Sequence, residues 1–182
     1  MIRQFSLTDK RYGFRKKFSY VLDANAYFSL TRVPYALEYA ESIGKIKDTD
    51  KIALALIRNE LPRVLVTGYV FYELQRLAGQ RVRRCGSMFP YFFELFKSKD
   101  VTFFVGNIPR YVLYRPPYCY VRKSIGEPDV SSVFAANLMG IPVVTDDGDF
   151  DMIKENFQTQ GFENKAEFDV LKTDEFVREI KL

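Results

Sequence analysis

The chain has no histidine among its 182 residues. This absence excludes Ser-His-Asp and Cys-His catalysis, zinc bound through histidine, and the paired histidines that cleave RNA without a metal ion. An enzyme of this composition must therefore use carboxylates, lysine, tyrosine, threonine or a metal ion.

Cysteine is scarce, and long apolar runs are missing. Cys85 and Cys119 lie too far apart in the sequence to suggest a local metal clip. No apolar run reaches the roughly 18 residues that a membrane helix needs, and residues 1–20 lack the apolar centre of a secretory signal. We therefore expect reduced thiols in a cytoplasmic protein with no membrane partner.

The residues that are present favour one α/β domain. Apolar residues make up 47% and aromatic residues 16% of the chain, enough for an ordinary buried core. Strand and helix patterns alternate, which favours a three-layer α/β/α fold with a central, mainly parallel sheet. Strands are predicted at residues 18–23, 63–67, 101–106, 141–145 and 168–171. Helices are predicted at residues 34–43, 51–61, 69–86 with a break at Gly79, 89–98, 128–139, 150–158 and 173–182.

The net charge of +4 is distributed unevenly along the chain. Residues 1–17 read as a basic N-terminal arm before a domain spanning 18–182, whose 76–125 region is basic and rich in aromatic residues. Cations neutralise phosphates and rings stack on unpaired bases, so this region suits single-stranded RNA. The RNA-binding candidates are Arg81, Arg83, Arg84, Arg110 and Arg115. The alternative is a solvated basic face.

Acidic residues stand at corresponding places in the predicted elements. Asp23 ends the first strand, Glu73 lies in the early turns of the helix after 63–67, Asp129 opens another helix, and Asp147 follows 141–145. In a parallel sheet all of these positions share the edge at the carboxyl ends of the strands. We therefore expect one acidic crevice, where the repulsion between carboxylates favours a hard divalent cation.

Each acid also has an ordinary explanation when it is taken alone. Asp129 could favour a helix dipole, Asp147 with Asp146 and Asp149 could form a turn, and Glu73 could pair with Arg76. Asp23 is harder to explain in this way, because burying a carboxylate at the end of a strand costs desolvation.

The order of these residues resembles the PIN-domain nucleases over residues 18–182. The matching segments are LDAN at 22–25, EL at 73–74, Asp129, TDDGDF at 145–150 and FDVLKTDEF at 168–176. The resemblance implies an endoribonuclease that hydrolyses RNA with water activated by Mg²⁺ or Mn²⁺. The basic arm and residues 107–126 have no simple counterpart in that family.

The resemblance also assigns roles to particular residues. It makes Asp23, Glu73, Asp129 and Asp147 catalytic residues that hold the metal, Asp149 a further ligand, and Asn25 and Thr145 supporting residues. A homodimer and, for a toxin of a toxin-antitoxin pair, an antitoxin-like inhibitor are further implied partners.

Several alternatives stay open at this point. The same fold could be a catalytically silent RNA-binding or assembly module, and a nuclease of this kind could be a toxin or an RNA-processing enzyme. A phospho-acceptor receiver domain normally has paired acids at the end of its first strand, where this chain has Asp23 alone. A different Mg²⁺-dependent phosphotransferase or phosphatase is the last alternative.

Overall fold

The computed structural model describes residues 2–9, 17–61, 63–85, 102–121 and 125–182, with residues 81–85 described by their backbone alone. Its centre is a six-stranded sheet in which every pair is parallel, in the order β1-β4-β3-β2-β5-β6. The strands are β1 (Ile2–Ser6), β2 (Tyr20–Leu22), β3 (Val64–Thr67), β4 (Phe103–Asn107), β5 (Val143–Val144) and β6 (Val170–Leu171). The sheet is thus entirely parallel, as the alternating pattern predicted.

Helices connect the strands and cover the sheet. The α-helices are α1 (Pro34–Ser42), α2 (Asp48–Ile57), α3 (Gly68–Cys85), α5 (Arg110–Leu113), α6 (Tyr118–Val121), α7 (Glu127–Met139), α8 (Asp149–Thr159) and α9 (Thr173–Glu179). The described residues also form the 3-10 helices η2 (Ala24–Thr31) and η3 (Glu163–Lys165). None of the helices within the described residues is both long and apolar enough to cross a membrane.

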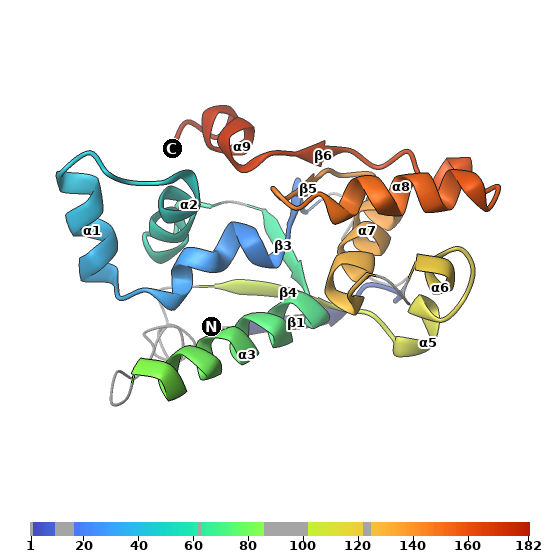
Figure 1. The fold of residues 1–182 in the computed structure, drawn as a ribbon, viewed down its shortest axis with the longest axis horizontal. Coiled ribbons are helices and arrows are strands. Elements are labelled where there is room, and N and C mark those ends of the chain that lie inside the picture. Colours follow the sequence, from blue (N-terminus) through green and yellow to red (C-terminus); the bar gives the residue numbers. More distant parts are fainter. Residues whose placement is uncertain (1, 10–16, 62, 86–101, 122–124) are drawn as a thin grey trace.

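Alternate strand residues enter two separate cores, one on each face of the sheet. Val64 and Val66 of β3 join a core with η2, α2, α3 and α9, whereas Leu65 joins a core with α5, α6, α7 and α8. Leu22 and Val21 of β2 divide in the same way. This alternation follows from the two-residue period of a strand, and it gives the three-layer α/β/α fold visible in Figure 1.

The observed helix boundaries show which sequence signals correctly predicted where a helix begins or ends. Pro128 lies in the first turn of α7, and Gly140 ends this helix with a φ of 65°, a conformation that glycine adopts without strain. The predicted break at Gly79 is wrong, because α3 continues through this residue to Cys85. The helix predicted at 89–98 lies outside the described residues.

The N-terminal segment contains a strand that the sequence analysis did not predict. Within the predicted basic arm, Ile2–Ser6 forms edge strand β1, which pairs in parallel with β4 along its whole length. Its sequence, IRQFS, has exposed polar residues and lacks the β-branched run that marks the central strands. An edge strand needs only one protected side, so its sequence signal is weak.

Buried Asp50 joins η2 to α2. Its carboxylate accepts hydrogen bonds from Ser29 Oγ at 2.5 Å, Arg32 Nη1 at 2.7 Å and the backbone N–H of Lys47 at 3.1 Å. Burial alone would raise the pKa of Asp50, but the hydrogen bonds from Ser29, Lys47 and Arg32 outweigh it and hold the pKa below its usual value.

We therefore expect Asp50→Ala to lower the free energy of unfolding by about 2–4 kcal/mol near pH 7, because it removes the buried carboxylate that accepts from Ser29, Arg32 and Lys47. A lowered folded-state pKa gives stability that is present above the unfolded pKa and is lost as the pH falls through the folded pKa. Urea unfolding at neutral and strongly acidic pH should therefore show a difference that shrinks in acid. Asp48→Ala in the same helix is the matched control, since Asp48 is more exposed and its ion pair among the described residues is with Lys51; an equal loss in both variants would contradict this account.

Candidate active site

Four of the predicted acids line one pocket of about 220 Å³, which we call the acidic pocket. Asp23, Glu73, Asp129 and Asp147 reach it from four separate segments of the chain. The other residues that line the pocket are Ala24, Asn25, Phe28 and Leu77.

The parallel topology explains why these segments meet. Asp23 directly follows β2 and precedes η2, Glu73 lies in α3 after β3, and Asp147 follows β5. Strands β3, β2 and β5 are neighbours in the sheet, so the segments after them emerge side by side at its carboxyl edge. Asp129 in the first turn of α7 completes the set, because α7 packs across β2 and β3.

The buried hydroxyl of Thr145 ties the pocket together. Its Oγ1 donates a hydrogen bond to Asp23 Oδ2 at 3.1 Å, and it accepts hydrogen bonds from Asn25 Nδ2 at 2.9 Å and from the backbone N–H of Asp147 at 3.1 Å. Thr145 therefore fixes both Asp23 and the backbone at Asp147. Asn25, predicted as a supporting residue, reaches Asp23 through Thr145: its Nδ2 donates to Thr145 Oγ1, which in turn donates to Asp23.

Asp23 is a buried carboxylate with an incomplete set of hydrogen bonds. It is 2% exposed, and its Oδ1 has no hydrogen-bond partner among the described residues. Burial raises the pKa of Asp23 from its usual 3.8 to about 6, and the charges of Glu73 and Asp147 add to this rise against the hydrogen bonds from Ala24 and Thr145. A bound cation would supply the partner that this buried oxygen lacks.

The pKa of Asp129 is raised further than that of Asp23. Burial, followed by repulsion from Asp23, Glu73, Asp147 and Asp149, raises the pKa of Asp129 to about 8. The carboxylates therefore cannot all ionise at neutral pH without a counter-ion. Oxygen ligands of this type match the preference of Mg²⁺ and other hard divalent cations.

The carboxylates share a pocket but do not form a finished coordination sphere. Within the described ranges, no group of three or more His, Cys, Asp or Glu side chains is arranged so that it could hold a metal ion. The donor chemistry and the orphaned Asp23 Oδ1 fit a divalent cation, whereas the side chains would have to draw closer together to bind it.

The remaining two acids of this region differ in their surroundings. The backbone N–H of Asp149 donates to Asp147 Oδ1 at 3.0 Å, and the side chain of Asp149 does not line the acidic pocket. Asp146 instead accepts hydrogen bonds from the backbone N–H and Oγ1 of Thr173, at the start of α9. Asp146 thus anchors α9, whose first residue is Thr173 and whose N-cap is Lys172.

The predicted RNA-binding arginines are only partly described. Arg110 lies 3.4 Å from Glu127 at the start of α7 and 5.3 Å from the ring centroid of Tyr114, and Arg115 lies 5.0 Å from that of Tyr111. Both cations are exposed, and Arg110 contacts Glu127 in the first turn of α7, the turn that also carries Asp129. The side chains of Arg81, Arg83 and Arg84 lie outside the described residues.

Sequence reasoning missed the apolar walls of the acidic pocket. Phe28 on η2 lines it while 55% exposed, and Leu77 lies on the same face of α3 as Glu73, four residues earlier. The four-residue spacing could have identified Leu77, but no sequence signal distinguished Phe28 from the core phenylalanines. The pairing of Glu73 with Arg76 at 3.7 Å, considered as the ordinary explanation, is present and coexists with the placement of Glu73 in the pocket.

Comparison of this chain with models of protein families, with curated proteins and with solved structures gives no match.

Proposed function

We propose that this protein is a Mg²⁺- or Mn²⁺-dependent ribonuclease of the PIN type, acting through the acidic pocket. One observation carries the proposal: Asp23, Glu73, Asp129 and Asp147, which are far apart in the sequence, line a single pocket at the carboxyl edge of a parallel sheet. Ligands of open α/β sheets bind at this edge.

The chemistry that a bound Mg²⁺ or Mn²⁺ would supply is a lowered pKa for water and neutralisation of the attacked phosphate. Asp23 would bind such an ion through Oδ1, since Thr145 already holds Oδ2. Asp129, Glu73 and Asp147 would supply further oxygens. The negative charge of these carboxylates would repel phosphate until the ion is present.

Residues around the pocket support RNA as the substrate. Phe28 lines the pocket with much of its ring exposed, so an unpaired base beside the cleaved phosphate could stack on it. Arg110 and Arg115 with their tyrosine partners provide exposed cationic and aromatic surface, and Arg110 lies beside the start of α7. Phe28→Leu would then weaken RNA binding, because it removes the ring on which the base could stack.

A catalytically silent PIN-like RNA-binding or assembly module is the second candidate. The observation that favours it is the lack, within the described ranges, of any carboxylate group arranged to hold a metal ion. The two candidates differ in one measurable property, which is cleavage.

Metal dependence tests the proposal directly. We expect the purified protein to cleave fluorescently labelled single-stranded RNA when Mn²⁺ or Mg²⁺ is present, to lose this activity in EDTA, and to regain it with excess Mn²⁺. Gel analysis of the products measures the result, with Ca²⁺ as a hard cation of larger size for comparison. Full cleavage in EDTA would overturn the metal mechanism. RNA binding without cleavage under every metal condition would favour the silent module.

A further inference from the structure

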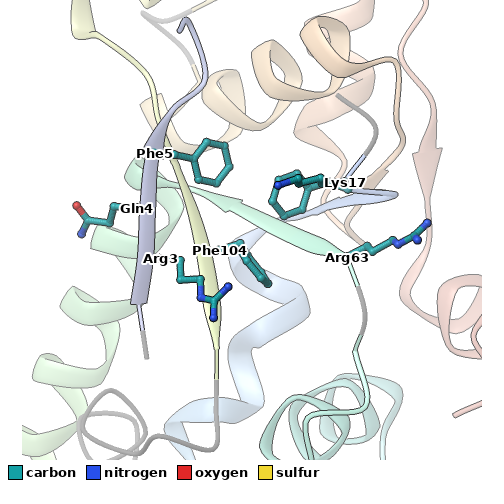
Figure 2. A pocket seen from close by; sticks show the side chains of 7 residues that line it. Arg3, Gln4, Phe5, Lys17, Arg63 and Phe104 are labelled. Atoms are coloured by element: carbon teal, nitrogen blue, oxygen red, sulfur yellow. The ribbon is translucent and has the colours of Figure 1, made fainter. Parts of the chain in front are cut away.

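A second pocket, which we call the cationic pocket, shares no lining residue with the acidic pocket (Figure 2). Its volume is about 450 Å³, within the range of sites for small molecules. The residues that line it are Arg3, Gln4, Phe5, Lys17, Phe18, Arg63 and Phe104. None of them is acidic, so the pocket has the opposite electrostatic character to the candidate active site.

Three phenyl rings build the apolar part of the cationic pocket. Phe18 is buried, and its ring is stacked with that of Phe5 at a centroid distance of 5.5 Å and an angle of 5°. The same ring meets Phe104 edge-on, at 5.4 Å and 67°. Phe104 is only half-buried and leaves ring surface open to a ligand, and Phe5 is half-buried beside it.

Sheet register brings the first cation to these rings. Arg3 of β1 is paired with Phe104 of β4, and its guanidinium lies 5.8 Å from the Phe104 ring centroid. Gln4, the next residue, alternates to the other side of the strand and points away from the rings in Figure 2.

Two further cations come from the segments before neighbouring strands. Lys17 precedes β2 and Arg63 precedes β3, and both are exposed, as is Arg3. No carboxylate of the described residues forms an ion pair with Arg3 or Arg63. The positive charge of these two guanidinium groups is therefore available to an anion.

We propose that the cationic pocket binds a nucleotide unit, with its base against Phe5 and Phe104 and its phosphate among Arg3, Lys17 and Arg63. The cations repel metal ions and cationic ligands and attract a phosphate. The exposed ring surface beside them favours a ligand that also carries a flat aromatic group, such as a base. Single-stranded RNA and free mononucleotides both present this unit. The assignment holds whether or not the acidic pocket cleaves RNA.

The test measures binding in EDTA, where the proposed cleavage is absent. Fluorescence anisotropy of a labelled oligouridylate of about five nucleotides, with unlabelled AMP, longer RNA and inorganic phosphate as competitors, gives the affinities. We expect Arg3→Gln/Arg63→Gln to weaken binding about tenfold and to reduce the salt slope by about 1.4, since each phosphate contact on a single strand contributes about 0.7. Phe104→Leu should also weaken binding about tenfold through lost stacking, while leaving the salt slope unchanged.

A matched control and a local readout make the test specific. Lys45→Gln/Lys181→Gln removes the same charge from exposed positions, and Lys181 has a positive φ, as Arg63 has; this variant should bind like the unchanged protein. Photocrosslinking with a 5-iodouridine oligonucleotide, followed by mass spectrometry, should attach to Phe5, Phe18 or Phe104. Thermal melts identify any variant that fails to fold, in which case the crosslink in the unchanged protein decides.

The outcomes separate the sources of the ligand. Competition by AMP at a strength comparable to the oligonucleotide supports the proposal with a free nucleotide as ligand, and competition by longer RNA alone supports it with an RNA chain as ligand. Equal competition by inorganic phosphate, unchanged affinity in the Arg3/Arg63 variant, or crosslinks confined to other residues would each overturn it.

Discussion

Asp23→Asn and Asp147→Asn are each expected to lower the rate of RNA cleavage by about a thousandfold or more, because each removes from the acidic pocket a carboxylate that we propose as a metal ligand. Asparagine keeps the shape of the side chain, and in Asp23→Asn its carbonyl oxygen can still accept the hydrogen bond from Thr145 Oγ1. The loss should therefore reflect the lost charge and leave the fold intact. Single-turnover cleavage of labelled RNA with saturating Mn²⁺ measures it.

Asp151→Asn is the matched control for these variants. Asp151 is an exposed acid in the first turn of α8, near Asp147 in the sequence, and it does not line the acidic pocket. Its substitution removes the same charge and should leave the cleavage rate within about twofold of the unchanged protein. If both Asp23→Asn and Asp147→Asn cleave RNA as fast as Asp151→Asn does, the acidic pocket is not the active site.

The fold could be predicted wherever apolar residues form a clear pattern. The β-branched run of β3, Val64–Thr67, and the proline and glycine that bound α7 were sufficient to predict both elements. Strand β1 could not be predicted in the same way, because three of its five residues are polar and its pairing depends on β4, about a hundred residues later. Long-range pairing is a property of the assembled sheet, which a local pattern does not contain.

The acidic residues of the acidic pocket were predictable for a different reason. Parallel strands bring their carboxyl ends to one edge whatever their spacing in the sequence, so the positions of Asp23 and Asp147 relative to their strands were enough. The hydrogen-bond network was not predictable, because a hydroxyl such as that of Thr145 both donates and accepts. Side-chain rotation decides that Asp146 turns to Thr173 at α9 while Asp147 turns to the pocket.

The raised pKa of Asp129 makes the acidic pocket a source of instability when no cation is present. Burial and the neighbouring carboxylates raise this pKa from 3.8 to about 8. A carboxyl whose pKa is higher in the folded state than in the unfolded state contributes stability that is present below the unfolded pKa and is lost as the pH rises through the folded pKa. In EDTA, the folded protein should therefore lose stability between about pH 4 and pH 8.

Asp129→Asn should remove this loss, because asparagine does not ionise. We expect the difference in free energy of unfolding, Asp129→Asn minus the unchanged protein, to grow by about 1–3 kcal/mol between about pH 4 and pH 8. This range is reduced because Asp129 is partly exposed and coupled to other carboxylates. The comparison between the two pH values is decisive, since the loss of a carboxylate from the first turn of α7 lowers stability by at most about 1 kcal/mol. Urea unfolding in EDTA measures both values, with Asp151→Asn as the control.

Addition of Mn²⁺ should reverse the order of stability. A cation that binds only the folded state adds stability according to its concentration and dissociation constant, and this gain requires the carboxylates that repel one another in its absence. The unchanged protein should therefore gain more stability from Mn²⁺ at pH 8 than Asp129→Asn does. An Asp129→Asn variant that is less stable than the unchanged protein at pH 8 in EDTA, and that gains equally from Mn²⁺, would mean that Asp129 neither repels its neighbours nor binds the ion with them.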